Sequence, residues 1–88
     1  MKVSFERAFL KDIARINDVK VAKQLKKILD AFESNNNLSQ FKNIKKLKGH
    51  NAYFRIRIGS YRLGFSYEND KIHVIRFLHR KDIYKSFP

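Results

Sequence analysis

Residues 52–67 read AYFRIRIGSYRLGFSY, and this stretch decides the fold of the chain. Apolar and polar side chains alternate along residues 52–58 and again along residues 61–67, which is the period of a β-strand with one buried face. Gly59 and Ser60, between the two runs, are residues that favour turns. The stretch therefore predicts two paired strands whose apolar sides face a core.

A third strand is predicted downstream, over residues 71–78, after a turn formed by residues 68–70. Its side chains are almost continuously apolar, as in a strand that is buried on both faces, so we expect it to be central in the sheet. Upstream, residues 2–5 alternate between polar and apolar side chains and predict a short first strand. The tail over residues 81–87 is too short to classify.

Two amphipathic helices are predicted between the first strand and the paired strands. Residues 6–16 carry apolar side chains at helical spacing, and Asp18 then supplies an N-cap for a second helix. The second helix has one apolar stripe, formed by Val21, Ala22, Leu25, Ile28, Leu29 and Phe32. Residues 34–37 end this helix, and the segment that follows, which includes residues 42–49, is predicted to be a connection.

The predicted order of elements is thus β-α-α-β-β-β, an α+β domain in which an antiparallel meander sheet carries two helices packed on one face. A chain of 88 residues has the size of one domain, so we expect a single domain over residues 1–88. No apolar run reaches the length of a membrane span, and the N-terminus lacks the pattern of a signal peptide. The chain has no cysteine, which excludes a disulfide framework and fits a cytoplasmic protein.

The charge of the chain points to a polyanionic partner. Twenty Lys and Arg stand against 8 Asp and Glu, a formal net charge of +12, and nucleic acid is the polyanion that such an excess usually serves. Residues 35–88 hold 12 of the basic and only 3 of the acidic side chains, so we expect the binding face in this half. Lysines of the connection are expected to attract phosphate: Lys42, Lys45, Lys46 and Lys48.

Arginines gather on the face of the paired strands that is opposite their apolar side chains. Arg55 and Arg57 are two residues apart in one strand, so both project from this open face. Arg62 joins them from the partner strand. Arg76 interrupts the apolar third strand, where an unpaired buried guanidinium is costly, and alternation directs it to the same face. Simple solvation also produces a charged strand face, so the arginines by themselves do not separate a binding site from a solvated surface.

Several catalytic motifs are missing from the sequence. It contains no phosphate-binding loop, no dinucleotide-binding fingerprint and no HExxH zinc motif. The histidines His50, His73 and His79 lack the spacing of a metal-ligand set. The few carboxylates of the second half are too sparse for the paired cations of a metal-dependent nuclease. We therefore expect no metal and no cofactor, and a site built from guanidinium groups, which bind phosphate bidentately.

Three motifs in the second half resemble the RelE/ParE superfamily of bacterial and archaeal toxins. They are Leu47-Lys48-Gly49, Phe54-Arg55-Ile56-Arg57-Ile58-Gly59-Ser60-Tyr61-Arg62 and Leu78-His79-Arg80-Lys81-Asp82-Ile83-Tyr84. The order β-α-α-β-β-β is also that of the family, so the resemblance extends over essentially the whole chain. It implies a toxin that is neutralised by a small antitoxin protein encoded alongside it.

The resemblance implies one of two activities. RelE-type toxins are metal-independent endoribonucleases that cut mRNA in the 30S decoding site of the ribosome, whereas ParE-type toxins poison DNA gyrase. The positions that carry catalysis in RelE are filled here by functional side chains: Arg55, Arg57, Arg62, Arg80 and Tyr84. We therefore expect the ribonuclease, with the gyrase inhibitor as the alternative. A non-catalytic RNA-binding module, which would leave RNA intact, is a third reading.

In the expected reaction the 2′-hydroxyl of the mRNA attacks the adjacent phosphate and leaves a 2′,3′-cyclic phosphate and a 5′-hydroxyl. Arg62, with the two arginines of the preceding strand, stabilises the developing charge, and Arg80 serves the leaving oxygen. His79 or Tyr84 moves the protons, His79 having the reference pKa nearest neutrality. Alternation from Arg76 nevertheless turns His79 away from the open face unless the strand ends before it. The expected RNA-binding residues are Lys45, Lys46, Lys48, Arg76 and Lys81.

Overall fold

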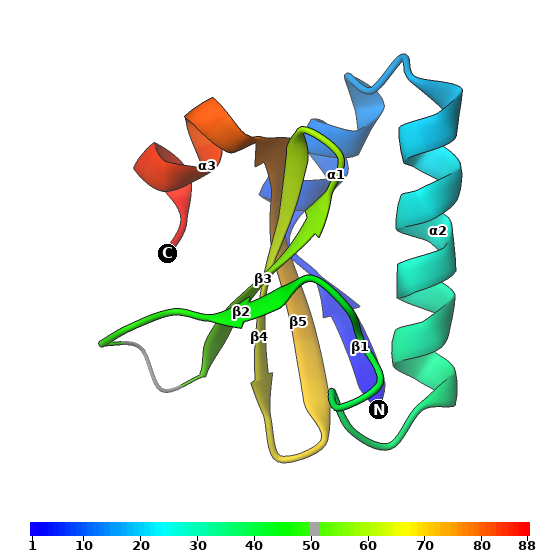
Figure 1. The fold of residues 1–88 in the computed structure, drawn as a ribbon, viewed down its shortest axis with the longest axis vertical. Coiled ribbons are helices and arrows are strands. Elements are labelled where there is room, and N and C mark those ends of the chain that lie inside the picture. The colour runs from blue at the N-terminus through cyan, green and yellow to red at the C-terminus, as the bar shows by residue number, and fades with distance from the viewer. Residues whose placement is uncertain (50–51) are drawn as a thin grey trace.

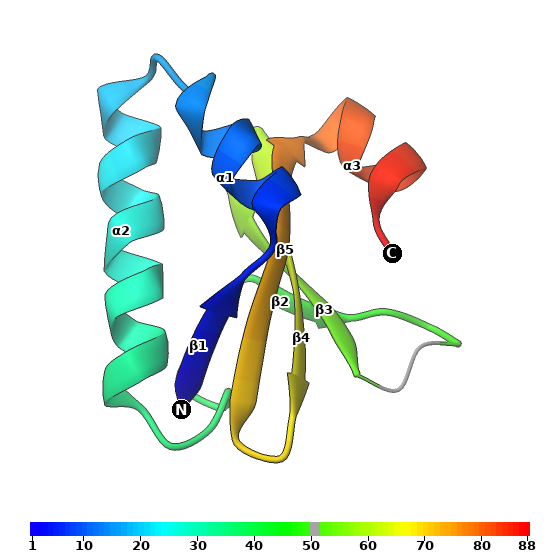
Figure 2. The same ribbon diagram turned by 180° about the vertical axis from the view of Figure 1, so that it is seen from behind.

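Three helices and one five-stranded mixed sheet make up the part of the chain that the computed structural model describes, residues 1–49 and 52–88 (Figures 1 and 2). The elements are β1 (Lys2–Phe5), α1 (Arg7–Ala14), α2 (Val19–Ser34), β2 (Ile44–Lys46), β3 (Tyr53–Ile58), β4 (Tyr61–Glu68), β5 (Lys71–His79) and α3 (Arg80–Ser86). The strand order is β1-β5-β4-β3-β2. The α+β class and the antiparallel meander of β3, β4 and β5 are as predicted.

The sheet contains one strand more than the sequence predicts, and its first strand runs in parallel. The segment expected to be a connection includes β2, whose Ile44 and Lys46 lie opposite Ile56 and Phe54 of β3. Three residues are too few for alternation to reveal a strand, so β2 exists because the edge of β3 offers backbone partners. β1 pairs in parallel with β5, so that β5 is no longer an edge strand of the sheet.

The third helix, α3, forms from the tail that the sequence left unclassified. It begins where the imidazole Nδ1 of His79 accepts a hydrogen bond from the backbone N–H of Lys81, 3.2 Å away. Ile83 of this helix is completely buried, and Phe87 just beyond it is 4% exposed. Two buried apolar side chains are therefore what holds so short a helix on the sheet.

The core lies between α2 and the sheet, and both predicted helices contribute to it. Its buried members are Phe9, Val21, Leu25, Phe32, Ile56, Ile58, Leu63, Phe65, Ile72, Val74 and Phe77. α2 starts at Asp18, whose carboxylate accepts hydrogen bonds from the N–H groups of Lys20 and Val21, as the sequence predicts. Each fully buried large apolar side chain contributes about 1.5–3 kcal/mol, so this interface determines the stability of the fold.

A register shift in the pairing of β4 with β5 explains part of the apolar run in β5. The register with β4 shifts between Gly64 and Phe65, so that Gly64 lies opposite Arg76 and Phe65 opposite Val74. The extra residue allows Val74 and Phe77, three positions apart, both to face the core. β5 is an interior strand between β1 and β4, as expected, although β4 is the middle strand.

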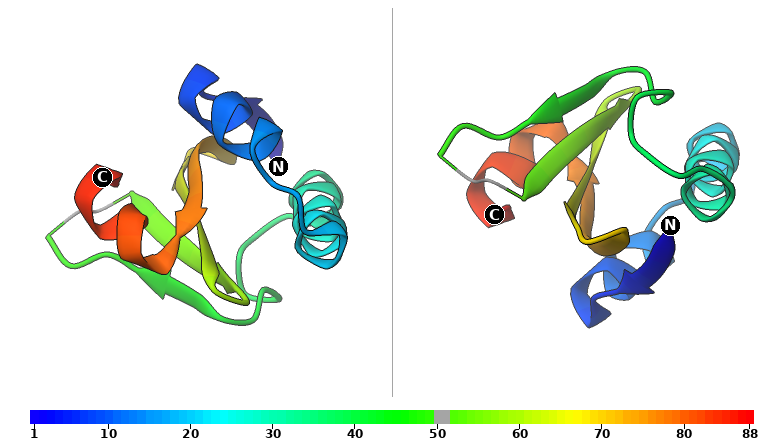
Figure 3. Two further views of the ribbon diagram at one scale, coloured as in Figure 1. Left: turned by 90° about the horizontal axis from the view of Figure 1, so that it is seen from above. Right: turned by 90° about the horizontal axis from the view of Figure 1, so that it is seen from below.

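The two faces of the sheet are covered differently. α2 runs along one face, whereas α3 lies on the other side of the strands, as the end-on views show (Figure 3). The ring of Phe87 sits directly on Gly64, because a Cβ atom at this glycine would lie 2.7 Å from Cδ2 of Phe87. Among the helices of residues 1–49 and 52–88, none has the length and hydropathy that a membrane span requires.

Candidate functional site: a cationic hollow on the sheet

A hollow of about 320 Å³ opens on the sheet face opposite α2, and basic side chains form most of its wall. We call it the cationic hollow; it is lined by Asn43, Lys45, Arg55, Arg57, Arg62 and Tyr84. None of these described lining residues is acidic, so the four basic side chains have no carboxylate within the wall to balance them. Such a site attracts a polyanion and suits the transient negative charge of phosphoryl chemistry.

The register of the sheet brings these basic side chains together. Lys45 of β2 lies opposite Arg55 of β3, and Arg57 of β3 lies opposite Arg62 of β4. Residues opposite each other in antiparallel strands project to the same side, with Cβ atoms about 4.5–5.5 Å apart. Three neighbouring strands thus bring four cations to one patch. The prediction that the three arginines share the open face is confirmed.

Arg62 is anchored to the turn that precedes it. Its Nη1 atom donates hydrogen bonds to the carbonyl oxygens of Gly59 and Tyr61, at 3.0 Å and 2.9 Å. Gly59 has a φ of 59°, which turns the backbone so that its carbonyl meets the arginine. Both bonds use the same nitrogen, so the Nε and Nη2 edge of the guanidinium is left out of the anchor and can face a ligand.

Tyr84 reaches the cationic hollow from α3 and stacks on Arg55. The Cζ atom of Arg55 lies 4.8 Å from the centre of the Tyr84 ring, a cation–π geometry. The tyrosine is 63% exposed and lines the hollow, so a ligand there can reach its side chain. Burial of Ile83 and Phe87 on the sheet positions the helix and therefore the tyrosine.

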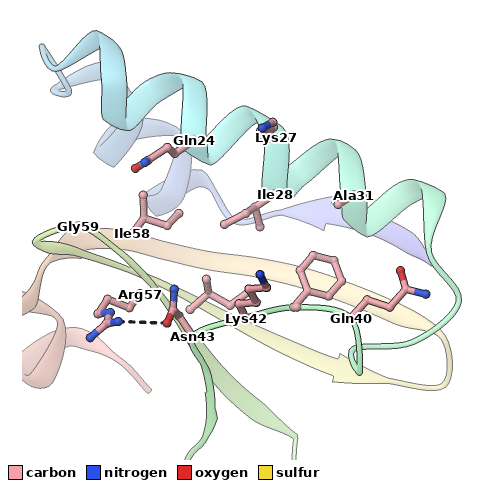
Figure 4. A pocket seen from close by; sticks show the side chains of 12 residues that line it. Gln24, Lys27, Ile28, Ala31, Gln40, Lys42, Asn43, Arg57, Ile58 and Gly59 are labelled. Atoms are coloured by element: carbon pink, nitrogen blue, oxygen red, sulfur yellow. Dashed lines mark hydrogen bonds between the residues drawn. The ribbon is translucent and has the colours of Figure 1, made fainter.

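Asn43 is a lining residue that sequence reasoning missed. It has a φ of 59°, and Arg57 donates to it twice. The Nη2 atom of Arg57 donates to Oδ1 at 3.1 Å (Figure 4), and its backbone N–H donates to the carbonyl oxygen at 3.0 Å. An asparagine tolerates the left-handed region better than most residues. Its only signal in the sequence is that of a turn-favouring residue among the lysines of residues 42–48, and that signal does not indicate which arginine it would contact.

Two of the expected catalytic residues are not brought to the cationic hollow. β5 extends through His79, so alternation holds and the imidazole turns to the other side of the sheet, edge-on to Tyr61 at 5.9 Å. There His79 lines a different hollow together with Asp18. Arg80 is exposed at the start of α3, and its backbone N–H donates to the Ser60 carbonyl at 2.8 Å. Its side chain is not part of the hollow's wall.

Arg76 lies opposite Gly64, on the side of the sheet that alternation predicts, but its side chain is paired with α1. Its Nε and Nη2 atoms donate to the two carboxylate oxygens of Asp12 at 2.8 Å and 2.9 Å, and the N–H of Phe77 donates to Oδ2 at 3.0 Å. The hydrogen bonds to Asp12 raise the pKa of the Arg76 guanidinium. This carboxylate balances the charge of Arg76, and Arg76 is not among the residues that line the cationic hollow, so its expected role in RNA binding stays a prediction.

The expected lysines differ in position. Lys45 lines the cationic hollow, whereas Lys46, Lys48 and Lys81 are exposed outside its wall. His50 lies outside the described residues. Within residues 1–49 and 52–88, no group of three or more His, Asp or Glu side chains gathers as metal ligands would.

A second hollow, of about 500 Å³, lies between α2 and β3 (Figure 4). Its wall is mainly apolar, with Ile28 on α2 and Phe41 and Ile58 on the sheet side. Asn43 and Arg57 line this hollow as well as the cationic one. The hydrogen-bonded pair therefore forms the partition between the two spaces.

Comparison with known proteins assigns the chain to a family of toxins. The model of the family described as ParE toxin of type II toxin-antitoxin system, parDE, matches residues 3–84. The chain is 42% identical to Toxin RelE3 of Methanocaldococcus jannaschii over 89 aligned residues, which cover 100% of both proteins. The chain therefore belongs to the RelE/ParE superfamily of type II toxin–antitoxin toxins.

Solved structures indicate which type of toxin within this superfamily the chain resembles. The RelB-RelE antitoxin-toxin complex from Methanococcus jannaschii contains a chain that matches with a TM-score of 0.84 and 38% identity, over 97% of this chain and 99% of that one. The YoeB dimer from Staphylococcus aureus has a TM-score of 0.74 at 21% identity, over 91% and 97% of the two chains, and shows the same fold. Within the superfamily, the chain is a RelE-type toxin of a toxin–antitoxin pair.

Proposed function

We propose that this toxin is a metal-independent endoribonuclease that cuts mRNA, with the ribosomal decoding site as the place of cleavage. The observation that carries the proposal is the cationic hollow, in which four basic side chains and one exposed tyrosine meet and no lining residue among those described is acidic. This composition suits a phosphodiester held without a metal ion, because guanidinium groups supply the positive charge that metal ions supply in metal-dependent nucleases. Ribonuclease activity is also what resemblance to RelE implies.

The proposed reaction uses the RNA as its own nucleophile. The 2′-oxygen loses its proton and forms a bond to the adjacent phosphorus, while the bond from phosphorus to the 5′-oxygen breaks and that oxygen gains a proton. The products are a 2′,3′-cyclic phosphate and a 5′-hydroxyl. Arg62 supports the phosphoryl oxygens through the guanidinium edge that its anchor leaves open, and Arg55 and Arg57 add positive charge beside it.

Proton transfer falls to Tyr84 rather than to His79 in this proposal. Tyr84 lines the cationic hollow, whereas His79 faces the other side of the sheet. Guanidinium groups do not release protons at physiological pH, so the three arginines serve charge stabilisation. The tyrosine hydroxyl, exposed beside Arg55, is a group of the wall that can exchange a proton with the RNA.

Primer extension on programmed ribosomes tests the proposal. Purified toxin is added to mRNA held in ribosomes and, in parallel, to the same mRNA without ribosomes. Cuts that appear only with ribosomes, within the codon of the decoding site, support the full proposal, and cuts in both reactions support a ribosome-independent nuclease. Intact mRNA in both reactions contradicts ribonuclease activity.

We also propose a RelB-type antitoxin as the partner and the cytoplasm as the location of this toxin. The similar toxins of Methanococcus jannaschii and of Escherichia coli have been solved as RelB-RelE and RelBE complexes. A formal net charge of +12 favours an acidic partner segment. Co-expression with the adjacent short reading frame tests the pairing; purification of the toxin alone, together with unrelieved growth arrest, contradicts it.

The second candidate function is inhibition of DNA gyrase, which the match to the ParE family model favours. This reading predicts accumulation of gyrase–DNA complexes in a supercoiling assay and intact mRNA in the cleavage assay. It also predicts that replacement of Arg55 or Tyr84 has no effect on toxicity. A non-catalytic RNA-binding module predicts salt-sensitive RNA binding with neither RNA cleavage nor gyrase inhibition.

A further inference from the structure

We propose that Asn43 is a positioning residue of the ribonuclease site, which holds Arg57 beside Arg62 without cancelling any of the positive charge. The inference rests on the proposed function, because positioning has a catalytic consequence only if the cationic hollow cleaves RNA. The tie itself is a property of the protein alone and can be measured without RNA.

Arg57 is held by Asn43 at both ends of the residue. The backbone N–H of Arg57 donates to the Asn43 carbonyl at 3.0 Å, and Nη2 of its guanidinium donates to Oδ1 at 3.1 Å (Figure 4). The first bond continues the pairing of β2 with β3 by one residue, so the position of Asn43 is determined by the sheet. The second bond transfers this rigidity to an exposed, long and otherwise flexible side chain.

The tie counters a repulsion that the sheet register creates. Arg57 lies directly opposite Arg62, and like charges in opposite positions of antiparallel strands repel each other. Without a tie, the side chain of Arg57 is free to turn into solvent. With it, both guanidinium groups stay on the wall of the cationic hollow, where they can approach one phosphate together.

Asparagine meets two requirements at this position that other residues meet only singly. The backbone φ of 59° is one that asparagine and glycine adopt more readily than most residues. The amide oxygen accepts from Arg57 while carrying no charge. An aspartate would keep the hydrogen bond but introduce a negative charge into a wall that has four positive ones. A glycine would keep the backbone but remove the acceptor.

The experiment compares Asn43→Gly with Asn43→Asp in single-turnover cleavage on programmed ribosomes. We expect Asn43→Gly to lower the cleavage rate constant about 10-fold to 10²-fold with little change in the substrate concentration for half-maximal rate. Asn43→Asp should weaken substrate binding, because the added carboxylate lowers the net positive charge of the cationic hollow. Asn69→Gly is the matched control: Asn69 also has a positive φ, 52°, but lies in the β4–β5 turn, and its cleavage should stay within about twofold of the unchanged protein.

A double-mutant cycle separates positioning from a general structural effect. In an Arg57→Met background, Asn43→Gly should cost less than about twofold, since the charged donor that it positions has gone. An equal loss in both backgrounds, or an Asn43→Gly protein that cleaves as fast as the unchanged one, overturns the proposal. Thermal unfolding of each variant shows whether a loss of cleavage reflects a loss of folding.

Side-chain ¹⁵N NMR of Arg57 keeps this inference distinct from the proposed function. In the protein without RNA, we expect restricted motion at the Arg57 guanidinium and increased motion in Asn43→Gly. If the unchanged protein leaves mRNA intact but shows this difference, the ribonuclease proposal fails while the tie stands. If Arg57 moves as freely in the unchanged protein as in Asn43→Gly, the tie itself is wrong.

Discussion

Two backbone carbonyls hold the Nη1 atom of Arg62, the residue that stabilises the transition state in the proposed ribonuclease reaction. We expect Arg62→Ala to lower the rate of mRNA cleavage by about 10²–10³, the usual cost of removing one preorganised donor. Arg62→Lys is the matched variant: it keeps the charge, loses the planar fork and should recover only part of the rate. Single-turnover cleavage measures both, and a loss below about threefold for Arg62→Ala rules out this role.

Individual site residues could be predicted from the sequence where alternation alone determines their side. Arg55, Arg57 and Arg62 follow this rule, because each is flanked by apolar residues that face the core. Arg76 follows the rule as well, since it lies opposite Gly64 on the same side as Arg62, but its partner could not be predicted, because Asp12 lies 64 residues away in the sequence and no local pattern relates the two. Asn43 was missed for the same reason: its contact with Arg57 depends on the pairing of β2 with β3.

At the scale of elements, the carboxylate of Asp12 joins α1 to β5. Asp12 is 5% exposed, and its carboxylate accepts three hydrogen bonds, two from Arg76 and one from the backbone N–H of Phe77. Phe77 lies in β5 past the residues that pair with β1. Asp12→Ala leaves that N–H and a half-buried guanidinium without their acceptor, so we expect a loss of about 2–4 kcal/mol in the free energy of unfolding. Urea denaturation measures this change.

Asp30→Ala is the matched control for this pair, since Asp30 forms an exposed ion pair with Lys26 one helical turn away. It should cost at most about 0.5 kcal/mol. Asp12 raises the pKa of the Arg76 guanidinium, so the guanidinium keeps its charge in this pair across the physiological pH range, and the stabilisation that depends on this charge is lost as the pH rises through the raised value. A stability loss for Asp12→Ala no larger than that for Asp30→Ala contradicts the joining role.

The contact between Gly64 and Phe87 determines how α3 lies on the sheet. A Cβ atom at residue 64 would come within 2.7 Å of the Phe87 ring, so Gly64→Ala must push the tail outward. Because Tyr84 belongs to the same helix, we expect its stacking on Arg55 to loosen and mRNA cleavage to fall about tenfold. Stability should fall by about 1–3 kcal/mol.

Ser66→Ala provides the control for Gly64→Ala, because Ser66 projects from the same face of β4 two residues further on. Cleavage by Ser66→Ala should match that of the unchanged protein. NMR contacts between the ring of Tyr84 and the side chain of Arg55 report directly on the stacking. If these contacts persist in Gly64→Ala, the tail does not position the tyrosine.

Long periodic elements were predictable from the sequence, and the short ones depend on their neighbours. α2 and the β3–β4 pair bury a regular apolar stripe, which the sequence displays at helical or strand spacing. β2 has three residues and α3 has seven, so neither carries enough repeats to be recognised. They form because β3 offers an unpaired edge and because Ile83 finds a buried site, and both of these are properties of the folded sheet.

At the scale of the whole molecule, the basic side chains behind the net charge of +12 lie on both sides of the sheet. The cationic hollow concentrates four basic side chains on one face, whereas the lysines of α2, such as Lys23, lie along the solvent side of the helix that covers the other. At an ionic strength of 0.15 M, charges act over about 8 Å, so the two faces attract a polyanion nearly independently of each other. Binding should therefore depend on where a charge is removed, even though the net charge changes equally.

Titration of a short single-stranded RNA over a range of salt concentrations tests this division. Each phosphate contact adds about 0.7 to the slope of the logarithm of the binding constant against the logarithm of salt concentration. We expect Arg55→Gln, in the cationic hollow, to reduce the slope by about 0.7 and Lys23→Gln, on α2, to leave it unchanged. Equal reductions for the two variants would mean that RNA is bound by the diffuse charge of the whole protein. In that case the hollow loses its role in binding, and its arginines act, if at all, only on RNA that the ribosome presents to them.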